Sequence, residues 1–415
     1  MDKVLSKIKN QVTLSNEEQA KIKETVKEFK SKLEPVLKKS KIDANIFVGG
    51  SVGKSTNLPG LHDIDIFVRF KTDGELSEII HDSLNSCFKK VTRLKGSRDY
   101  FKVKLNEFEI EVIPVLYITR PNQAKNITDH SPFHVNWSKR KSKNLVEDIK
   151  IAKQFFIGVG AYGAESWIGG FSGHVIEILT VNYGGFKKLI KGISKWGDET
   201  FVDVEKYYSN AGDAISSLDN AKLESPLLVI DPVDKERNAA AAVSKEKYEF
   251  LKEITTKFLK KPTLKSFEEN LITASDIEKK VKKNKLFLFS AKPESHKHDA
   301  AGAKMLNHYK KIKKMFTEHN FEIIDSGFFW DKKNDGLIWF IMNPKELTKK
   351  HILKGPPTYE SGVNILNFKK KYARKKVWRE GYNYFVEVSR KYVKSEQIVK
   401  LIKSDEGFSF LTLKK

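Results

Sequence analysis

The chain has 415 residues, and its 76 Lys and Arg against 53 Asp and Glu give a formal net charge of +23 at pH 7. Hydrophobic residues make up 40% and charged residues 31%, which excludes a disordered chain and predicts about two to four folded domains. The single cysteine, Cys87, excludes an internal disulfide and a cysteine-rich zinc site, and no segment predicts a signal peptide or a membrane span. We therefore expect a cytoplasmic protein with no membrane partner.

The first part of the chain predicts a mixed α/β domain. Residues Ser15 to Glu18 form a capping box, and the apolar residues that follow it have helical spacing. Short strands are predicted at residues 46–48 and 64–70. A third strand, from about residue 101 to 117, would place apolar side chains on one face and three glutamates on the other.

The middle of the chain predicts helices. An apolar stripe runs from Leu145 to Phe156, and a buried helix is expected over residues 171–183, ended by Gly184-Gly185. The stretch from 225 to 238 is typical of a linker. It leads to another helix that ends near residue 262.

The last third of the chain returns to strands, which are predicted at residues 286–289, 327–330 and 337–342. A loop at 355–357 and a very basic helix over 361–379 follow. Taken together, the elements predict an α+β multidomain protein with three parts, at residues 1–140, 141–262 and 263–415.

Positive charge is clustered along the chain, most densely at residues 369–376, where Phe368, Tyr372 and Trp378 lie among the lysines. Lysine and arginine bind phosphates, and aromatic side chains stack on exposed bases. An RNA or DNA partner is therefore favoured over a solubilising lysine coat. It is also favoured over a membrane surface, because no segment is clearly basic and amphipathic with a terminal anchor.

A pair of aspartates predicts the chemistry. Asp63 and Asp65 are two residues apart, so on a strand they point to the same face and need a cation between them. A third carboxylate from Glu107, Glu109 or Glu111 would complete a two-metal Mg²⁺ site for phosphoryl transfer. The glycines and serine at residues 49–51 would let backbone N–H groups approach a triphosphate. A solvated strand edge is the ordinary alternative for the aspartate pair alone.

A phosphate-binding P-loop is a second alternative for residues 49–56. The spacing disfavours it, because Val48 stands where the first glycine of such a loop is required. Pro59-Gly60 would also interrupt the helix that follows such a loop.

Several motifs together resemble known families. Gly50-Ser51 with Asp63-Ile64-Asp65 and a carboxylate before Val112-Ile113-Pro114 is similar to the nucleotidyltransferase superfamily of DNA polymerase β. Further motifs resemble the archaeal (class I) CCA-adding enzymes, and they occur in order from about residue 47 to 357. These motifs are Pro132-Phe133-His134, Tyr162-Gly163-Ala164-Glu165, Gly170-Phe171-Ser172-Gly173, the run from Asp231 to Asn238, and Gly355-Pro356-Pro357.

The resemblance implies a role for individual residues. The catalytic, metal-binding carboxylates would be Asp63, Asp65 and Glu111, where the family more typically has Glu-x-Asp and then Asp. The nucleotide-binding residues would be Gly50, Ser51, Lys54, His134, Lys153, Tyr162 and Arg237. Lys54 stands where the family usually has arginine, and Arg237 falls on the arginine that helps to select CTP and ATP. Taken singly, most of these side chains could equally have a structural role. Their positions within motifs that match the family favour a role in binding.

The resemblance implies a polymerase β-like nucleotidyltransferase head with a mixed sheet, a helical middle domain and α+β RNA-binding C-terminal domains. It further implies a tRNA nucleotidyltransferase that adds the 3′-terminal CCA with CTP, ATP and two Mg²⁺ ions. The partner is tRNA, gripped on its acceptor stem and TΨC side, with Lys369, Lys370, Lys371 and Arg374 as expected contacts. A poly(A)-type or A-only transferase and a non-catalytic RNA-binding protein stay open as alternatives. The oligomeric state is open as well, with a homodimer as one option.

Overall fold

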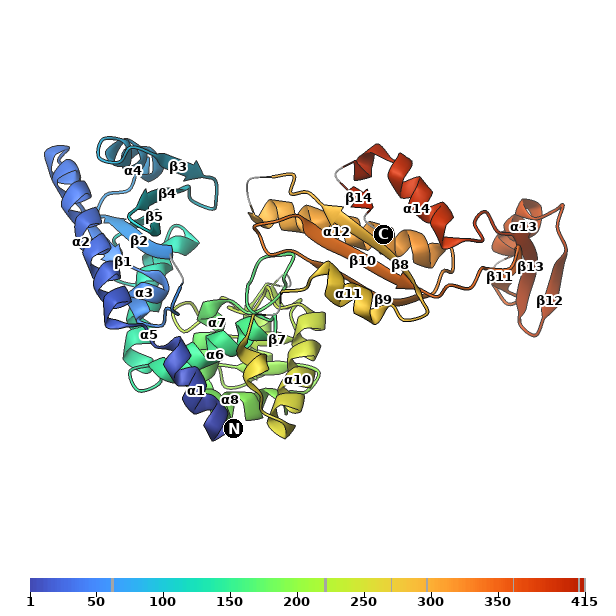
Figure 1. The fold of residues 1–415 in the computed structure, drawn as a ribbon, viewed down its shortest axis with the longest axis horizontal. Coiled ribbons are helices and arrows are strands. Elements are labelled where there is room, and N and C mark those ends of the chain that lie inside the picture. The colour runs from blue at the N-terminus through green and yellow to red at the C-terminus, as the bar shows by residue number, and fades with distance from the viewer. Residues whose placement is uncertain are drawn as a thin grey trace. The chain divides into compact units, whose positions relative to one another are not determined.

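The computed structural model describes residues 1–60, 63–219, 222–269, 271–295, 298–360, 362–409 and 411–413. The chain divides into two compact units, residues 1–270 and residues 271–415 (Figure 1). Among the described residues, no helix is long and apolar enough to cross a membrane. The finer division into three parts stays a prediction.

A five-stranded sheet forms the head of the first unit, with the strand order β1-β2-β5-β4-β3 (Figure 1). β2 and β5 are parallel, and the other neighbouring pairs are antiparallel, so the sheet is mixed as predicted. The strands are β1 (Ala44–Val48), β2 (Asp63–Phe70), β3 (Val91–Leu94), β4 (Tyr100–Leu105) and β5 (Phe108–Leu116).

Helices α2 (Asn16–Lys39) and α4 (Leu76–Asn85) share one hydrophobic core with this sheet. The predicted capping box begins α2. Ser15 Oγ accepts a hydrogen bond from the Glu18 backbone N–H at 3.1 Å, and the Glu18 carboxylate accepts one from the Ser15 N–H at 2.8 Å. Phe29 and Leu33 then turn inward and are fully buried against the sheet.

The single strand predicted over residues 101–117 is wrong, because the chain reverses within it. Asn106 has a φ of +56° and forms a tight turn between β4 and β5, which pair as a hairpin. Leu105 and Phe108 on either side of the turn are both buried, so the apolar pattern conceals the reversal. Glu107 lies in the turn, where it pairs with Lys21 at 3.7 Å, and Glu109 and Glu111 lie on β5.

The rest of the first unit is mainly helical and has its own core, rich in phenylalanine. The predicted helix over 171–183 is confirmed as α7, which ends at Gly184 in the left-handed conformation (φ +71°). Leu5, Ile8 and Val12 of an N-terminal helix that the sequence analysis missed also enter this core. The helices are α1 (Asp2–Val12), α3 (Gly50–Lys54), α5 (Ser131–Lys141), α6 (Val146–Gly158), α7 (Gly173–Tyr183), α8 (Phe186–Ile193), α9 (Ala211–Ser217) and α10 (Lys245–Lys260).

The linker predicted over residues 225–238 is wrong. Its residues Leu227–Val229 form β7, which is fully buried and runs parallel to β6 (Thr200–Val202). Two of its polar residues, Asp231 and Asn238, are buried. The Asn238 side chain accepts a hydrogen bond from the Val229 N–H at 3.0 Å and donates one to the Leu227 carbonyl at 3.2 Å.

The second unit contains two antiparallel sheets. The larger has the order β14-β8-β10-β9, and its strands β8 (Lys285–Ala291), β9 (Ile323–Phe329) and β10 (Gly336–Met342) lie where strands were predicted. The smaller has the order β11-β13-β12. The remaining elements are β11 (Lys350–Pro357), β12 (Val377–Glu380), β13 (Asn383–Ser389), β14 (Leu411–Leu413), α11 (Ala274–Lys280), α12 (His298–Glu318), α13 (Gly362–Lys371) and α14 (Ser395–Ser404).

Two predictions for this unit are wrong. Residues 355–357 are not a loop but the end of β11, and β11 is an edge strand, where prolines without an N–H group are tolerated. The basic helix is shorter than predicted: α13 ends at Lys371, and residues 377–380 form β12. Residue 361, its predicted start, lies outside the described residues. A Cβ on Gly355 would lie 2.5 Å from the Phe368 ring, so the glycine lets α13 pack on β11.

Candidate active site

The glycine turn after β1 lies directly against the predicted carboxylates. The Gly49 N–H donates to the Asp65 carbonyl at 2.8 Å. Gly50 has a φ of +53°, and a Cβ on it would lie 1.6 Å from Asp65 Oδ2. A larger residue at Gly50 would therefore displace the carboxylate. The turn continues into α3, a short helix that ends at Lys54 and is capped by Ser55, so no long P-loop helix follows.

The parallel pairing of β2 and β5 brings the acidic residues together. Asp65 is aligned with Glu111, and Asp63 with Glu109. Burial, reinforced by the charges of Glu111 and Asp63, raises the pKa of Asp65 to about 6. Carboxylates that repel one another in this way are stabilised by a cation, and their hard oxygens suit Mg²⁺. The donor set therefore fits a divalent metal.

Lys102 on β4 partly neutralises this cluster. Its ammonium forms ion pairs with Glu109 and, at 3.1 Å, with Glu111 Oε1. Burial alone would lower the pKa of Lys102, but these two carboxylates raise it. Among the described residues, Asp63 and Asp65 form no ion pair. Both aspartates are therefore available to a cation. Lys102 pairs with both glutamates, so it does not separate them, but the strand register aligns Glu111 with Asp65 and favours Glu111 as the third ligand.

A cavity of about 380 Å³ opens beside the glycine turn, between the head and the helical part of the same unit. Four residues predicted to bind nucleotide line it: Gly50, Lys54, His134 and Arg237. His174, which the sequence analysis did not single out, lines it as well. The other three predicted nucleotide-binding residues, Ser51, Lys153 and Tyr162, are not in this lining.

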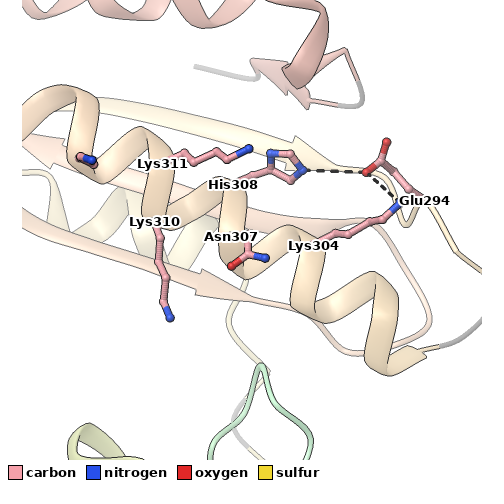
Figure 2. Close-up of a pocket in the computed structure, with 7 residues that line it drawn as sticks. Glu294, Lys304, Asn307, His308, Lys310 and Lys311 are labelled. Carbon is pink, nitrogen blue, oxygen red and sulfur yellow. Dashed lines mark ion pairs between the residues drawn. The ribbon is translucent and has the colours of Figure 1, made fainter. Parts of the chain in front are cut away.

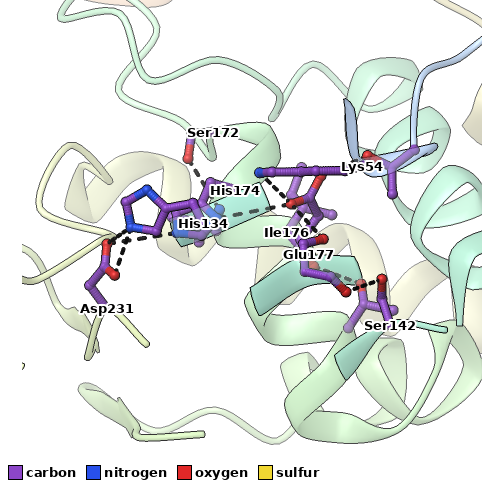
Figure 3. Close-up of polar contacts among 12 residues, drawn as sticks. Lys54, His134, Ser142, Ser172, His174, Ile176, Glu177 and Asp231 are labelled. Carbon is purple, nitrogen blue, oxygen red and sulfur yellow. Dashed lines mark hydrogen bonds and ion pairs between the residues drawn. The ribbon is translucent and has the colours of Figure 1, made fainter. Parts of the chain in front are cut away.

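One buried network lies on the wall of the cavity and centres on Asp231, which is 0% exposed (Figure 3). His134 Nε2 lies 2.9 Å from Asp231 Oδ1, and Arg237 Nη1 donates to Oδ2 at 2.7 Å. Burial and the neighbouring His174 lower the pKa of His134 to about 4, although Asp231 opposes this, so the ring is neutral near pH 7. Asp231 thereby fixes both side chains at the cavity.

His134, His174 and Asp231 also have ligand atoms within 4.8 Å of one another, as in a metal site. The Arg237 guanidinium, however, already supplies a positive charge to Asp231. A cation there would meet like-charge repulsion, so the carboxylates of β2 and β5 fit a metal better.

A second buried network centres on Glu177 of α7, which is 1% exposed (Figure 3). Its Oε2 pairs with Lys54 at 2.8 Å and its Oε1 with Lys153 at 2.7 Å. Burial alone would raise the pKa of Glu177, but the ammonium groups of Lys153 and Lys54 hold it well below its usual value. Tyr162 lies close by: a Cβ on Gly173, at the start of α7, would lie 3.0 Å from its hydroxyl.

The central residues of both networks escaped the sequence analysis. His174 and Glu177 lie in a helix that was predicted to be buried. Two polar residues at positions i and i+3 of an otherwise apolar helix were the available signal for a buried polar site. Asp231 stood in the supposed linker. Lys54, Lys153 and His134, three of their partners, are remote in sequence, so local pattern could not show those contacts.

Two basic surfaces lie in the second unit. α13 carries Lys369, Lys370 and Lys371 in its last turn, has no buried residue, and places Lys369 Nζ 4.8 Å from the Tyr384 ring centroid. α12 carries another group of lysines around a cavity of about 400 Å³ (Figure 2). The lysines there are Lys304, Lys310, Lys311 and Lys314. Arg374, the fourth predicted contact, is exposed just after α13.

The acidic cluster predicts a pH dependence of metal binding. Asp65 must be ionised to bind a cation, so Mg²⁺ affinity should fall as the pH drops through about 6. Protons and metal compete for the same oxygens, so more Mg²⁺ should move the acid limb of the activity profile to lower pH. Calorimetric titration measures the Mg²⁺ affinity at each pH, and initial rates at several Mg²⁺ concentrations measure the position of the acid limb. An acid limb that ignores Mg²⁺ would contradict the assignment.

The fold and the acidic site define the class of the protein. A nucleotidyltransferase domain model matches residues 21–134, the second domain of tRNA nucleotidyltransferases matches 147–268, and the C-terminal domain of CCA-adding enzymes matches 296–410. The protein is a nucleotidyltransferase. The CCA-adding enzyme of Nanoarchaeum equitans is 36% identical over 355 residues, which cover 85% of this chain and 86% of that relative. The chain belongs to the CCA-adding enzyme family.

Other comparisons agree. The CCA-adding enzyme of Pyrobaculum aerophilum is 29% identical over 91% of this chain and 87% of its own length. A solved structure of a cytoplasmic RNA terminal U-transferase has a TM-score of 0.51 at 13% identity, covering 65% of this chain and 98% of that one. At that identity the likeness shows the shared fold alone.

Proposed function

We propose that this protein adds and repairs the 3′-terminal CCA of tRNA with CTP and ATP, without a nucleic-acid template. The observation that carries the proposal is the group of Asp63, Asp65 and Glu111 on adjacent parallel strands, in a chain of the CCA-adding family. The glycine turn and a cavity with cationic walls lie beside them.

In the proposed reaction the tRNA 3′-hydroxyl attacks the α-phosphate of CTP twice and of ATP once, and each attack releases pyrophosphate. Asp63, Asp65 and Glu111 would hold Mg²⁺, and two such ions, when bound, would activate the hydroxyl and stabilise the leaving pyrophosphate. The turn at Gly50 and Ser51 offers backbone N–H and hydroxyl donors to the triphosphate, and Lys54 offers positive charge. His134, Lys153 and Tyr162 would contact the sugar and phosphates.

Base selection is assigned to Arg237, acting with the tRNA backbone. Its side chain is 34% exposed and lines the cavity, and Asp231 holds the guanidinium on one side at 2.7 Å. The N–H groups on its other side can donate to a base edge, and the planar group does so in a fixed direction.

Arg237→Ala is expected to damage nucleotide choice more than tRNA affinity. A site that hydrogen-bonds its substrate discriminates by roughly 1–3 kcal/mol per contact, so UTP and GTP should gain roughly tenfold or more relative to CTP and ATP. Rates with each of the four nucleotides measure this. Lys235→Ala, in the same loop and exposed, is the control. An unchanged nucleotide profile in Arg237→Ala would remove the assignment.

We assign the grip on tRNA to residues 263–415, the head chemistry to residues 1–140 and base recognition to residues 141–262. Duplex RNA is read by shape and phosphates, which suits an enzyme that acts on every tRNA. The contacts proposed for the acceptor stem and TΨC side are Lys369, Lys370, Lys371 and Arg374.

Changing Lys369, Lys370 and Lys371 together to glutamine should flatten the salt dependence of tRNA binding. Each lost phosphate contact removes about 0.7–0.9 from the slope of log K against log salt. Filter binding across a salt series measures the slope. The control changes Lys23, Lys27 and Lys38 of α2, which removes the same charge from the head. If the two triple variants showed the same slope of log K against log salt, the lysines of α13 would be solvent-exposed residues that do not contact tRNA.

The deciding experiment is gel-resolved extension of tRNA transcripts that lack A, CA or CCA, with Mg²⁺ and each nucleotide separately. Addition of C, C and A, followed by a stop, supports the proposal. Addition of A alone, or of long A tails, would assign the chain to another RNA terminal transferase. No extension of any RNA would leave a tRNA-binding protein and contradict the proposal.

A further inference from the structure

Glu177 joins three elements at the back of the cavity. Its carboxylate on α7 binds Lys54 from α3 and Lys153 from α6, and Thr56 Oγ1 donates to Glu177 Oε1 at 2.8 Å. All four side chains are buried. Two ammonium groups and one carboxylate leave a net charge of +1 in a site that water barely reaches.

The two lysines differ in what they can still bind. Lys153 Nζ donates to Glu177 Oε1, to Thr56 Oγ1 at 2.8 Å and to the Thr56 carbonyl at 3.3 Å, so its three N–H groups all have acceptors. Among the described residues, the ammonium of Lys54 has one acceptor, Glu177 Oε2. Lys54 also lines the cavity. Two of its N–H groups are therefore left for a ligand.

We infer that Glu177 is a positioning residue for the nucleotide: it holds the Lys54 ammonium at the cavity wall, where the remaining N–H groups meet the triphosphate. Lysine is a flexible point charge, unlike the forked guanidinium of arginine, so it needs an external anchor to bind phosphate in one place. Lys153 stabilises the anchor by pairing with the second oxygen of Glu177. The inference rests on the proposed function, because it takes the ligand to be a nucleoside triphosphate.

The alternative is that Glu177 only ties the head to the helical part. A purely structural carboxylate would affect stability, and its loss would weaken CTP binding by the same factor whether or not Lys54 is present. A carboxylate that acts through Lys54 would have no effect on CTP binding once Lys54 is gone. The two roles are thus separated by a double-mutant cycle.

The test measures the dissociation constant of CTP with Mg²⁺ and without tRNA, by calorimetry. Glu177→Gln and Lys54→Met should each weaken CTP binding by about tenfold or more, since each breaks a buried charge pair. The double variant should bind CTP within about twofold of Lys54→Met. In steady-state CTP addition, Glu177→Gln should raise KM and change kcat much less.

Asp99→Asn is the matched control. Asp99 is also a buried carboxylate between two cations, with Arg93 Nε at 2.6 Å and Lys95 Nζ at 2.8 Å, but it does not line the cavity. It should bind CTP like the wild type. The double variant loses one positive and one negative charge, so it leaves no additional unpaired charge in the buried network. The comparison of the double variant with Lys54→Met therefore tests the inference even if Glu177→Gln alone does not fold.

The outcomes separate this inference from the proposed function. Further weakening of CTP binding when Glu177→Gln is added to Lys54→Met, or unchanged binding in a folded Glu177→Gln variant, overturns the inference. A wild-type protein that binds CTP but does not extend tRNA contradicts the proposed function instead, and the comparison of CTP affinities still decides the role of Glu177.

Discussion

Asp65→Asn is expected to reduce nucleotide transfer by about 10³-fold or more while tRNA binding stays near the wild-type level. The amide keeps the shape of the side chain but removes the charge that completes the acidic group with Asp63 and Glu111. Loss of a metal ligand forfeits several kcal/mol of transition-state stabilisation, and each 1.36 kcal/mol is tenfold in rate. Single-turnover extension and filter binding measure the two quantities.

The same substitution should stabilise the metal-free protein. A carboxyl with a raised pKa in the folded state makes the wild type lose stability as the pH rises from about 4 to about 6. At pH 7 the neutral amide avoids that cost, so the free energy of unfolding should rise by about 1–3 kcal/mol. Glu107→Gln, in the hairpin turn, is the control that should keep activity. If Asp65→Asn still transferred nucleotides at the wild-type rate, Asp65 could not be a metal ligand.

Asp231→Asn is expected to lower the free energy of unfolding of the first unit by about 3–5 kcal/mol, because it weakens the charge-assisted hydrogen bonds that the fully buried carboxylate forms with His134 and Arg237. Asp231 Oδ1 also accepts from the Val233 N–H at 2.9 Å, so the carboxylate orders its own loop. A loss of that size lowers Tm by roughly 10 °C in a unit of this length. Thermal unfolding with and without CTP measures it.

Selectivity should change in the same variant, because Arg237 and His134 both depend on Asp231 for their positions. UTP and GTP should compete better with CTP and ATP, as is also expected for Arg237→Ala. Asp234→Asn is the control, because Asp234 lies in the same loop and accepts one backbone bond, from Glu236 at 3.1 Å. Wild-type stability and selectivity in Asp231→Asn would show that Arg237 holds its place without the carboxylate.

Local signals in the sequence predicted the start of one helix, the end of another and the strand that carries Asp63 and Asp65. The capping box at Ser15 is confirmed as the start of α2, and the glycine at 184 as the end of α7. The two-residue spacing of Asp63 and Asp65 did place them on one strand, β2. Capping, glycine turns and strand alternation act over a few residues, so they can be read from adjacent letters.

The predictions from sequence were wrong where one local pattern is compatible with more than one structure. The alternation of apolar residues through 101–117 suits one strand or a hairpin, and Asn106 decides for the hairpin. The polar stretch over 225–238 suits a linker or a buried, hydrogen-bonded segment, and the contacts of Asn238 decide for the second. The prolines at 356 and 357 suit a loop or an edge strand, and only the sheet order shows the edge.

By itself, the sequence determined the mixed head, the glycine turn, the aspartate pair and the resemblance that led to the family. Only the tertiary structure decided which glutamate lies beside Asp65, because that depends on the register of β2 and β5. It also showed that Asp231 and Glu177 anchor the cationic residues of the cavity. Glu177 lies 123 residues from Lys54, and Asp231 lies 97 residues from His134, so no local spacing encodes these contacts.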